Sequence, residues 1–188
     1  HERAERSTFI SAFLDGRVSR SGFAAMTAQL SFIYDALDSG AALLRGDPIV
    51  GPFLDPRLAR GAALDADLTE LVGIDWREQV TASPATVAHA ERIRHLAQTW
   101  PGGYLAHHYL RYLGDLSGGK VLGKTAQRVY GVSDAGVRFY RFDTIPSGRE
   151  FKDAYRQLLD DAPWPEDERR RILEEASLGF RMRGAMFD

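Results

Sequence analysis

The 188-residue chain contains no cysteine. This excludes a disulfide framework, a zinc–thiolate or iron–sulfur site and a cysteine nucleophile, and it suits a reducing cytoplasm. No apolar run approaches the roughly 18 residues that a membrane span needs, and no signal-peptide pattern is present. The formal net charge is −2, so there is no overall basic field for nucleic acid or an anionic membrane. We therefore expect a soluble cytoplasmic protein with neither as a partner.

Lysine is scarce as well, with Lys120, Lys124 and Lys152 the only lysines among 24 basic residues. Such an arginine bias is consistent with a GC-rich bacterial genome. Hydrophobic residues make up 44% of the chain and charged residues 27%, which is ordinary for a globular protein. The length suits one domain, so we expect residues 1–188 to form a single domain. Because the chain begins at His1 and not at methionine, we also expect that residues upstream of His1 are missing.

Apolar residues recur at three- and four-residue steps through most of the chain, which is the spacing of amphipathic helices. Ser83 followed by Pro84 is typical of a helix start, and Ser147 with Glu150 forms a capping box. Pro165 precedes a last helical pattern. There is no internal repeat and no convincing strand pattern. The sequence predicts an all-α bundle of roughly six to eight helices.

Three glycines, Gly114, Gly118 and Gly119, interrupt the helical pattern of residues 104–130. Each interior glycine destabilises a helix by about 1 kcal/mol relative to alanine, so another interaction should compensate. Gly114 and Gly118 share a helix face and leave a strip of bare backbone, which permits a kink and close approach of either a second helix or a flat ligand. Asp115 beside the strip favours the ligand, because a carboxylate is costly to bury in a tight apolar contact.

The same stretch matches the spacing of a phosphate-binding loop through Gly118, Gly123, Lys124 and Thr125. That motif requires a buried strand before the loop and a parallel sheet around it. The pattern before the loop is helical, and the chain has no run of strands. We therefore do not expect a nucleotide hydrolase.

The segment from Tyr112 to Gly119, Tyr-Leu-Gly-Asp-Leu-Ser-Gly-Gly, resembles the distal-helix signature of haem oxygenases of the soluble bacterial type. Residues 1–9 resemble the proximal-histidine segment of that family, and residues 139–142 and 152–156 resemble its later helices. The resemblance implies a compact bundle with haem between a proximal helix and a kinked distal helix. It further implies cleavage of haem by O₂ and electrons to biliverdin, CO and ferrous iron, for iron acquisition or haem degradation. Haem would be both substrate and cofactor, and a reductase or a ferredoxin would donate electrons.

The resemblance also assigns roles to residues. His1 would ligate the iron, with Glu5 accepting a hydrogen bond from its second ring nitrogen. Asp115 would anchor waters that deliver protons, and Arg111 would hold it ionised and oriented. Tyr34 could join this network, and a buried core tyrosine explains it equally well.

Gly114 and Gly118 would let the distal helix approach the haem. The other haem contacts that we expect are Tyr109, Ser117, Gly119, Lys152, Arg156 and Phe180. Of these, Tyr109, Lys152 and Arg156 would meet the propionates and so select the IXα isomer of biliverdin. Arg183 departs from the pattern, because it stands where bacterial members of the family carry a neutral amide.

The remaining histidines, His89, His95, His107 and His108, are rivals for the iron. His107 and His108 are nearest the glycines, but adjacent residues face about 100° apart on a helix and cannot both address one metal easily. We expect them to be packing or surface residues.

Two other functions share parts of this pattern. A haem transport or storage protein would need the histidine and the pocket but not Asp115, and a helical hydrolase of thiamine-related compounds would need a nucleophilic cysteine. Separately, Lys120, Lys124 and Arg128 form a basic stripe at four-residue steps, which fits either an acidic electron donor or an ordinary solvated helix face.

Overall fold

The computed structural model describes the backbone of residues 8–186 and the side chains of residues 10–186. Within that range the chain is helical and contains no β-strand. The α-helices are α1 (Thr8–Leu14), α2 (Arg20–Leu44), α3 (Gly61–Leu71), α4 (Trp76–Gln79), α5 (Pro84–Thr99), α6 (Pro101–Gly114), α7 (Lys120–Tyr130), α8 (Gly148–Asp161) and α9 (Glu166–Ala185). The all-α prediction is confirmed. Without the single turn α4, the described residues form eight α-helices, within the expected range of roughly six to eight.

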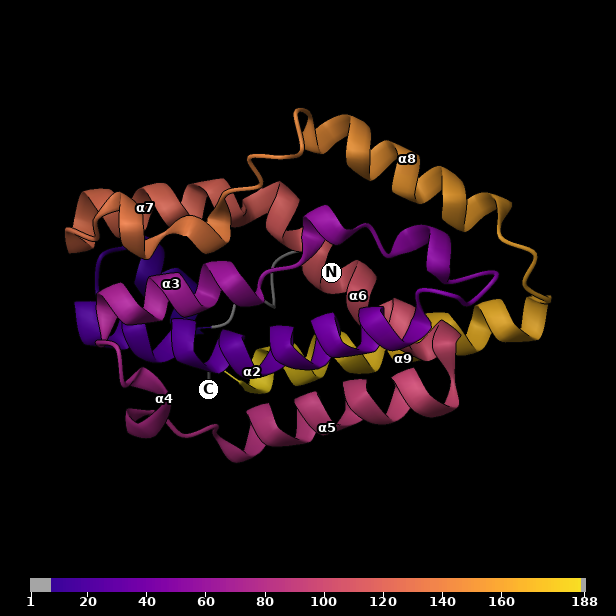
Figure 1. The fold of residues 1–188 in the computed structure, drawn as a ribbon, viewed down its shortest axis with the longest axis horizontal. Coiled ribbons are helices and arrows are strands. Elements are labelled where there is room, and N and C mark those ends of the chain that lie inside the picture. The colour runs from indigo at the N-terminus through magenta and orange to yellow at the C-terminus, as the bar shows by residue number, and fades with distance from the viewer. Residues whose placement is uncertain (1–7, 187–188) are drawn as a thin grey trace.

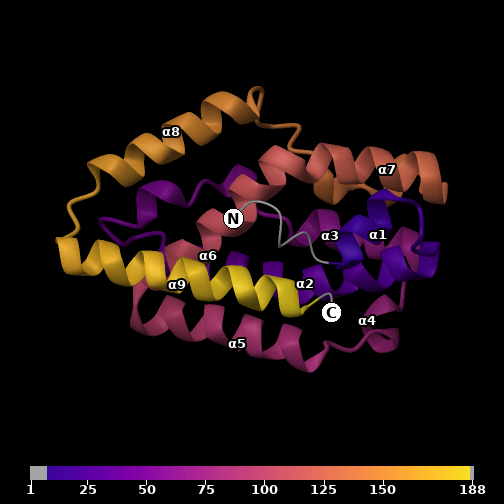
Figure 2. The same cartoon turned by 180° about the vertical axis from the view of Figure 1, so that it is seen from behind.

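The long helix α2 is the centre of the bundle. It packs against α3 and α5 along much of its length, and its buried face carries Phe23, Ile33, Tyr34 and Leu37. Figure 1 shows α2 between α3 and α5, with α7 and α8 along the edge of the bundle opposite α5. Seen from behind, α9 lies across the front between α8 and α5 (Figure 2), and it packs on α6.

The helix starts read from the sequence are confirmed. The Ser83 hydroxyl accepts from the Thr86 amide at 3.2 Å, and the Ser147 hydroxyl accepts from the Glu150 amide at 3.2 Å. α9 begins directly after Pro165. No helix within residues 8–186 is both long enough and apolar enough to cross a membrane.

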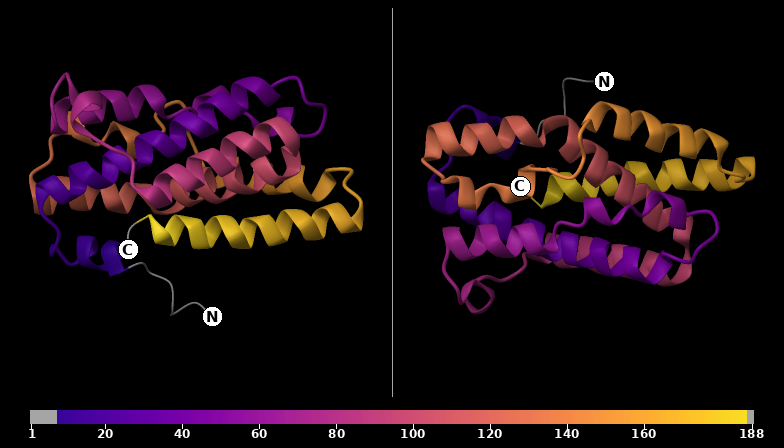
Figure 3. Two further views of the ribbon diagram at one scale, coloured as in Figure 1. Left: turned by 90° about the horizontal axis from the view of Figure 1, so that it is seen from below. Right: turned by 45° about the horizontal axis from the view of Figure 1, so that its top comes forward.

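The glycine cluster forms a π-helical turn, η3 (Asp115–Gly119), which joins α6 to α7 without an intervening loop. Gly114 and Gly119 keep helical dihedrals, with φ of −61° and −58°. The wider turn changes the direction of the helix, and Figure 3 shows α6 and α7 running along different axes. The kink expected of this helix is therefore present.

A buried carboxylate, Asp67 of α3, fixes the short 3₁₀ helix η5 (Arg138–Tyr140) against the bundle. Its two oxygens accept from the amides of Arg138 and Phe139, each at 2.8 Å. Burial raises the pKa of this carboxyl to about 6, even though both hydrogen bonds act to lower it. Phe139 and Tyr140 of η5 pack towards Tyr34 and the glycine turn, so Asp67 helps to place the site described below.

Replacing Asp67 with alanine should destabilise the fold by about 2–4 kcal/mol, because two buried amides lose their acceptors. The folded protein binds the Asp67 proton more tightly than the unfolded chain, whose pKa is near 3.8. The contribution of this carboxyl is therefore largest at low pH and falls as the pH rises through about 6. Urea unfolding of wild type and Asp67→Ala should give a larger difference at pH 5 than at pH 8. A difference that grows with pH would contradict this assignment.

Candidate functional site

The site is organised by one hydrogen bond between the central helix and the π turn. The Tyr34 hydroxyl of α2 donates to Oδ2 of Asp115, the first residue of η3. The Tyr34 ring is fully buried and is held edge-on by Tyr112 at 5.5 Å and by Phe139 at 5.0 Å between ring centroids. Burial raises the pKa of Tyr34 well above its ordinary value, so the phenol remains a donor. Tyr34 is thus both a buried core tyrosine and a hydrogen-bond partner of Asp115, and its part in a catalytic network stays a prediction.

Asp115 itself is half-buried. Burial raises the pKa of its carboxyl above the ordinary value, against the opposing effects of Arg111, the Tyr34 hydrogen bond and Arg183. The result is a carboxyl that takes up a proton more readily than a surface aspartate does. Such a group suits the transfer of protons.

Arg111 acts on Asp115 differently from the sequence expectation. It is buried, its guanidinium carbon lies 5.2 Å from the centre of the Tyr34 ring, and it forms no ion pair with Asp115. It lowers the pKa of Asp115, but burial outweighs it, so Arg111 does not dominate the charge state of the carboxyl. The Nε atom of Arg111 is buried without a hydrogen-bond partner among the described residues.

The glycines of the turn have different surroundings. A Cβ built on Gly118 would meet no described atom within 4 Å, so among the described residues Gly118 does not serve close helix packing. One built on Gly114 would meet Nη1 of Arg183, on α9, at 3.4 Å. Gly119 is buried, and a Cβ there would lie 3.4 Å from the Tyr140 ring, an ordinary van der Waals contact.

Two of the expected propionate contacts lie on α8. The Lys152 ammonium donates to the Ser117 hydroxyl at 2.8 Å, and that hydroxyl donates to the Leu113 carbonyl at 2.7 Å, which ties α8 to the π turn. Arg156 is exposed and pairs with Asp153 at 3.1 Å, so in this structure its charge is compensated.

Two further expected contacts, Tyr109 and Phe180, lie on α6 and α9. Tyr109 lines a hollow of about 370 Å³ between α6, α8 and α9, together with Leu105, Leu159, Ile172 and Leu173. Phe180, farther along α9, is 40% exposed, which is unusual for so large an apolar side chain.

The rival histidines are confirmed as packing residues, apart from His95, which is exposed on α5. His107 lies between His89 at 3.1 Å and Glu175 at 2.8 Å, and His108 faces the Tyr155 hydroxyl at 2.9 Å. All three are buried, and burial lowers the pKa of His108 to about 3. Each already has a partner in the bundle core.

The expected iron ligand His1 and its companion Glu5 lie outside the described residues. Two further residues, Arg183 and Tyr140, border the site and were not among the site residues expected from the sequence. Arg183 reaches Gly114 from α9, and Tyr140 buries a hydroxyl without a hydrogen-bond partner among the described residues. A tyrosine between Phe139 and Arg141 gives no sign in the sequence that its hydroxyl will lack a partner.

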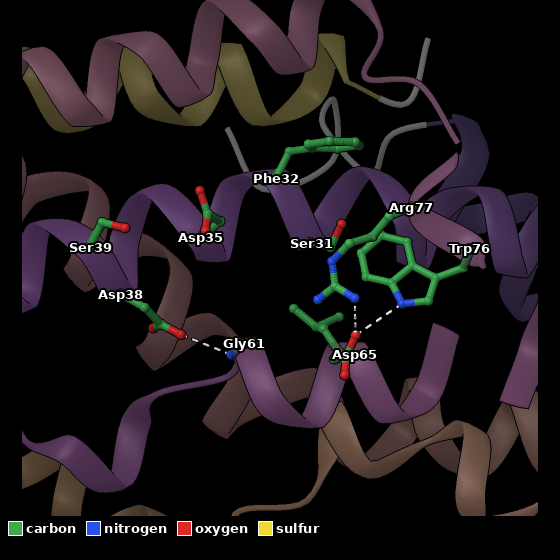
Figure 4. A pocket seen from close by; sticks show the side chains of 10 residues that line it. Ser31, Phe32, Asp35, Asp38, Ser39, Gly61, Asp65, Trp76 and Arg77 are labelled. Atoms are coloured by element: carbon green, nitrogen blue, oxygen red, sulfur yellow. Dashed lines mark hydrogen bonds and ion pairs between the residues drawn. The ribbon is translucent and has the colours of Figure 1, made fainter. Parts of the chain in front are cut away.

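A second hollow, of about 410 Å³, lies between α2, α3 and α4 (Figure 4). Its carboxylates are occupied: Asp38 accepts from the Gly61 amide at 2.8 Å, and Asp65 accepts from Trp76 at 3.0 Å and from Arg77 at 2.6 Å. None of the expected site residues lines it. It is not the site that the glycine turn forms.

The geometry therefore defines an all-helical protein with a bare-backbone strip, apolar side chains beside it and a carboxyl able to exchange protons. The whole chain, residues 1–188, matches the family model described as Heme oxygenase. It is 37% identical to "Heme oxygenase 1" of Synechocystis sp. over 100% of this chain and 78% of that protein. It is also 37% identical to "Heme oxygenase 1" of Nostoc sp., over 100% and 79% of the two chains.

Solved structures agree. The structure of heme oxygenase-1 from Synechocystis sp. in complex with heme matches with a TM-score of 0.92 and 38% identity, over 98% of this chain and 83% of that one. The heme oxygenase of Leptospira interrogans matches with a TM-score of 0.92 and 32% identity, over 98% and 90%. The chain belongs to the haem oxygenase family.

A Gly118→Ala variant separates a ligand surface from a packing surface. Because its methyl group would meet no described atom, the ligand-free protein should keep its stability or gain about 0.5–1 kcal/mol. The methyl group would occupy the strip that a flat ligand approaches, so the haem dissociation constant should rise at least about tenfold, or about 1.4 kcal/mol. Urea unfolding and haem titration by absorption measure the two effects.

The matched control is Gly123→Ala on the same helix, whose Cβ would lie 3.1 Å from Cβ of Tyr140. That variant should lose stability, and its added methyl group would face Tyr140 and not the strip. Equal loss of stability in both variants, with unchanged haem affinity in Gly118→Ala, would show that Gly118 serves packing.

Proposed function

We propose that this chain binds haem along the glycine strip and cleaves it to biliverdin, CO and ferrous iron, with O₂ and externally supplied electrons. The observation that supports this most strongly is the pairing of a glycine strip, open among the described residues at Gly118, with a carboxyl held by Tyr34. Membership of the haem oxygenase family supports the same reaction.

The residues present fit such a ligand. The strip lets a flat molecule approach the helix backbone, and the exposed apolar side chains of α9, Leu173 and Phe180, provide a surface for a hydrophobic ring. Bound haem supplies the iron that binds and activates O₂, so the protein has to position the haem and manage protons. We propose that His1 would ligate the iron and that Glu5 would accept a hydrogen bond from its ring.

Asp115 and the groups around it would transfer the protons that the reaction requires. Its raised pKa lets the carboxyl accept a proton from water and return it, and the Tyr34 hydroxyl keeps one carboxylate oxygen fixed while this happens. The buried Nε of Arg111 offers a further donor for water near the strip. These groups can deliver protons to the haem face without a distal histidine.

The orientation of the haem would be set at its edge. Lys152 lies against Ser117 beside the strip, and Arg156 is one turn away on α8, so both can reach propionates. Charge-assisted hydrogen bonds contribute about 1.5–3 kcal/mol each, enough to favour one rotation of the ring in its pocket. We propose that this rotation yields the IXα isomer.

The direct test adds haem, O₂ and an electron source to the full chain and follows the absorption spectrum. The haem band should disappear and biliverdin should accumulate, as one isomer when the product is separated by chromatography. Haem that binds and remains intact through repeated reduction would instead indicate a haem transport or storage protein.

The Asp115→Asn variant tests the proton role. The amide keeps the shape and a hydrogen bond to Tyr34 but cannot exchange a proton, so biliverdin formation should slow by at least about 100-fold while haem still binds. Because burial raises the pKa of Asp115, ionisation at this site opposes folding as the pH rises through that pKa. The variant should therefore unfold at a higher temperature than wild type at pH 8. The difference between the two unfolding temperatures should shrink at acid pH.

Asp75→Asn, a change of the same charge at an exposed position, is the control for both measurements. Normal biliverdin formation by Asp115→Asn would remove Asp115 from the mechanism.

A protein electron donor is also part of the proposal. Lys120, Lys124 and Arg128 are exposed along α7, directly after the glycine turn, and Lys120 and Lys124 border a hollow that Arg141 also lines. A positive surface of this kind attracts an acidic reductase or ferredoxin, and salt screens the attraction.

Charge reversal by Lys124→Glu should slow reduction by such a donor about tenfold at low salt, with little effect from a small-molecule reductant. Arg170→Glu, an exposed reversal on α9, should have a smaller effect. Stopped-flow reduction at several ionic strengths measures both. Equal slowing with the protein donor and the small reductant would indicate damage to the haem site. The cytoplasmic location and the bacterial origin stay predictions.

A further inference from the structure

Arg183, in the last turn of α9, carries a guanidinium group for which the bundle supplies no partner. Its Nη1 lies 3.4 Å from the Cβ position of Gly114, the first glycine of the strip. It is half-buried, and no hydrogen bond or ion pair joins it to any other described residue. A cation in this position, partly removed from water and without a counter-ion, is stabilised by any anion that binds beside it.

The contact between α9 and α6 explains why Arg183 lies there. At Gly179 the two helices approach so closely that a Cβ would lie 2.9 Å from the His107 ring. Arg183 is one helical turn beyond Gly179, so the same approach carries its side chain over Gly114. Figure 2 shows α9 crossing in front of α6.

The charges around Arg183 leave a positive excess. Arg111 and Asp115 are its nearest charged neighbours, and repulsion from Arg111, followed by burial, lowers the pKa of Arg183. Asp115 is bonded to Tyr34 and, because of burial, has a raised pKa of its own. Among the described residues, the guanidinium groups of Arg111 and Arg183 thus face the single carboxyl of Asp115, so one positive charge there has no compensating partner.

The face of α9 that ends at Arg183 is otherwise apolar. Leu173, Ala176 and Phe180 precede it at steps of three and four residues, and Leu173 and Phe180 are 68% and 40% exposed. The helix thus presents an apolar surface with one cation at its end, next to the bare backbone. This arrangement suits a flat apolar ligand together with a small anion bound beside Arg183.

We propose that Arg183 is a specificity residue that makes the strip side of the haem pocket favour small anions over neutral ligands. The inference rests on the proposed haem site. It concerns recognition of whatever occupies the space next to Gly114, and it assigns Arg183 no part in proton transfer.

The probe is azide, added to the ferric haem complex of the full chain and followed by absorption. Arg183→Gln should weaken azide binding about tenfold, which corresponds to about 1.4 kcal/mol. Fluoride binding should weaken as well in this variant. Binding of carbon monoxide, a neutral molecule, to the ferrous complex should change less than about twofold, because no charge is involved.

Two further variants separate charge from shape. Arg183→Lys should keep much of the azide affinity, since it retains the positive charge. Arg181→Gln removes an equal charge from an exposed position on the same helix and should leave azide binding unchanged.

Haem titration of each variant keeps the two proposals apart. Failure of the wild-type chain to bind haem would overturn the proposed function itself. Normal haem binding by Arg183→Gln with unchanged azide affinity would overturn the role of Arg183 and leave the proposed function intact. Equal weakening of azide and carbon monoxide would also overturn it, because that outcome indicates a change of pocket shape.

Discussion

The hydrogen bond from Tyr34 to Asp115 is the constraint on which the site depends. It joins the central helix α2 to the π turn that interrupts the regular helix between α6 and α7. Tyr34 cannot move without disturbing Tyr112 and Phe139, so it places the Asp115 carboxyl from a rigid support. The carboxyl is held beside the open strip at a cost, because burial opposes its ionisation.

The glycines of the turn likewise destabilise the helix while they expose its backbone. Three glycines in a helix cost about 3 kcal/mol relative to alanine. Gly119 lies against the Tyr140 ring inside the bundle, whereas Gly118 meets nothing among the described residues. The Lys152–Ser117 hydrogen bond braces the turn from α8, and the Asp67 cap fixes Phe139 and Tyr140 behind it. Groups outside the turn thus maintain an open surface that the turn could not maintain alone.

Local signals in the sequence predict the fold well, and the site in part. Ser83, Ser147 and Pro165 mark helix starts through contacts within one turn, so no tertiary information is needed. The glycine spacing beside Asp115 predicts a ligand surface for the same reason. Arg183 could not be placed in this way, because its position depends on how closely α9 approaches α6 at Gly179. The charge of Arg111 lowers the pKa of Asp115, but its balance against burial depends on tertiary packing that the sequence does not show. The assignments of His1 and Glu5 stay predictions.

The central claim is that a flat ligand lies against the bare backbone of the π turn while Tyr34 holds Asp115 beside it. A crystal structure of the full chain with haem tests this most directly. The account predicts the haem plane in contact with Gly114 and Gly118, Phe180 against the ring, the iron bound to His1 and the Tyr34–Asp115 hydrogen bond retained. Haem bound elsewhere, for example in the hollow between α2, α3 and α4, or a turn whose glycines are covered by protein in the complex, would contradict it.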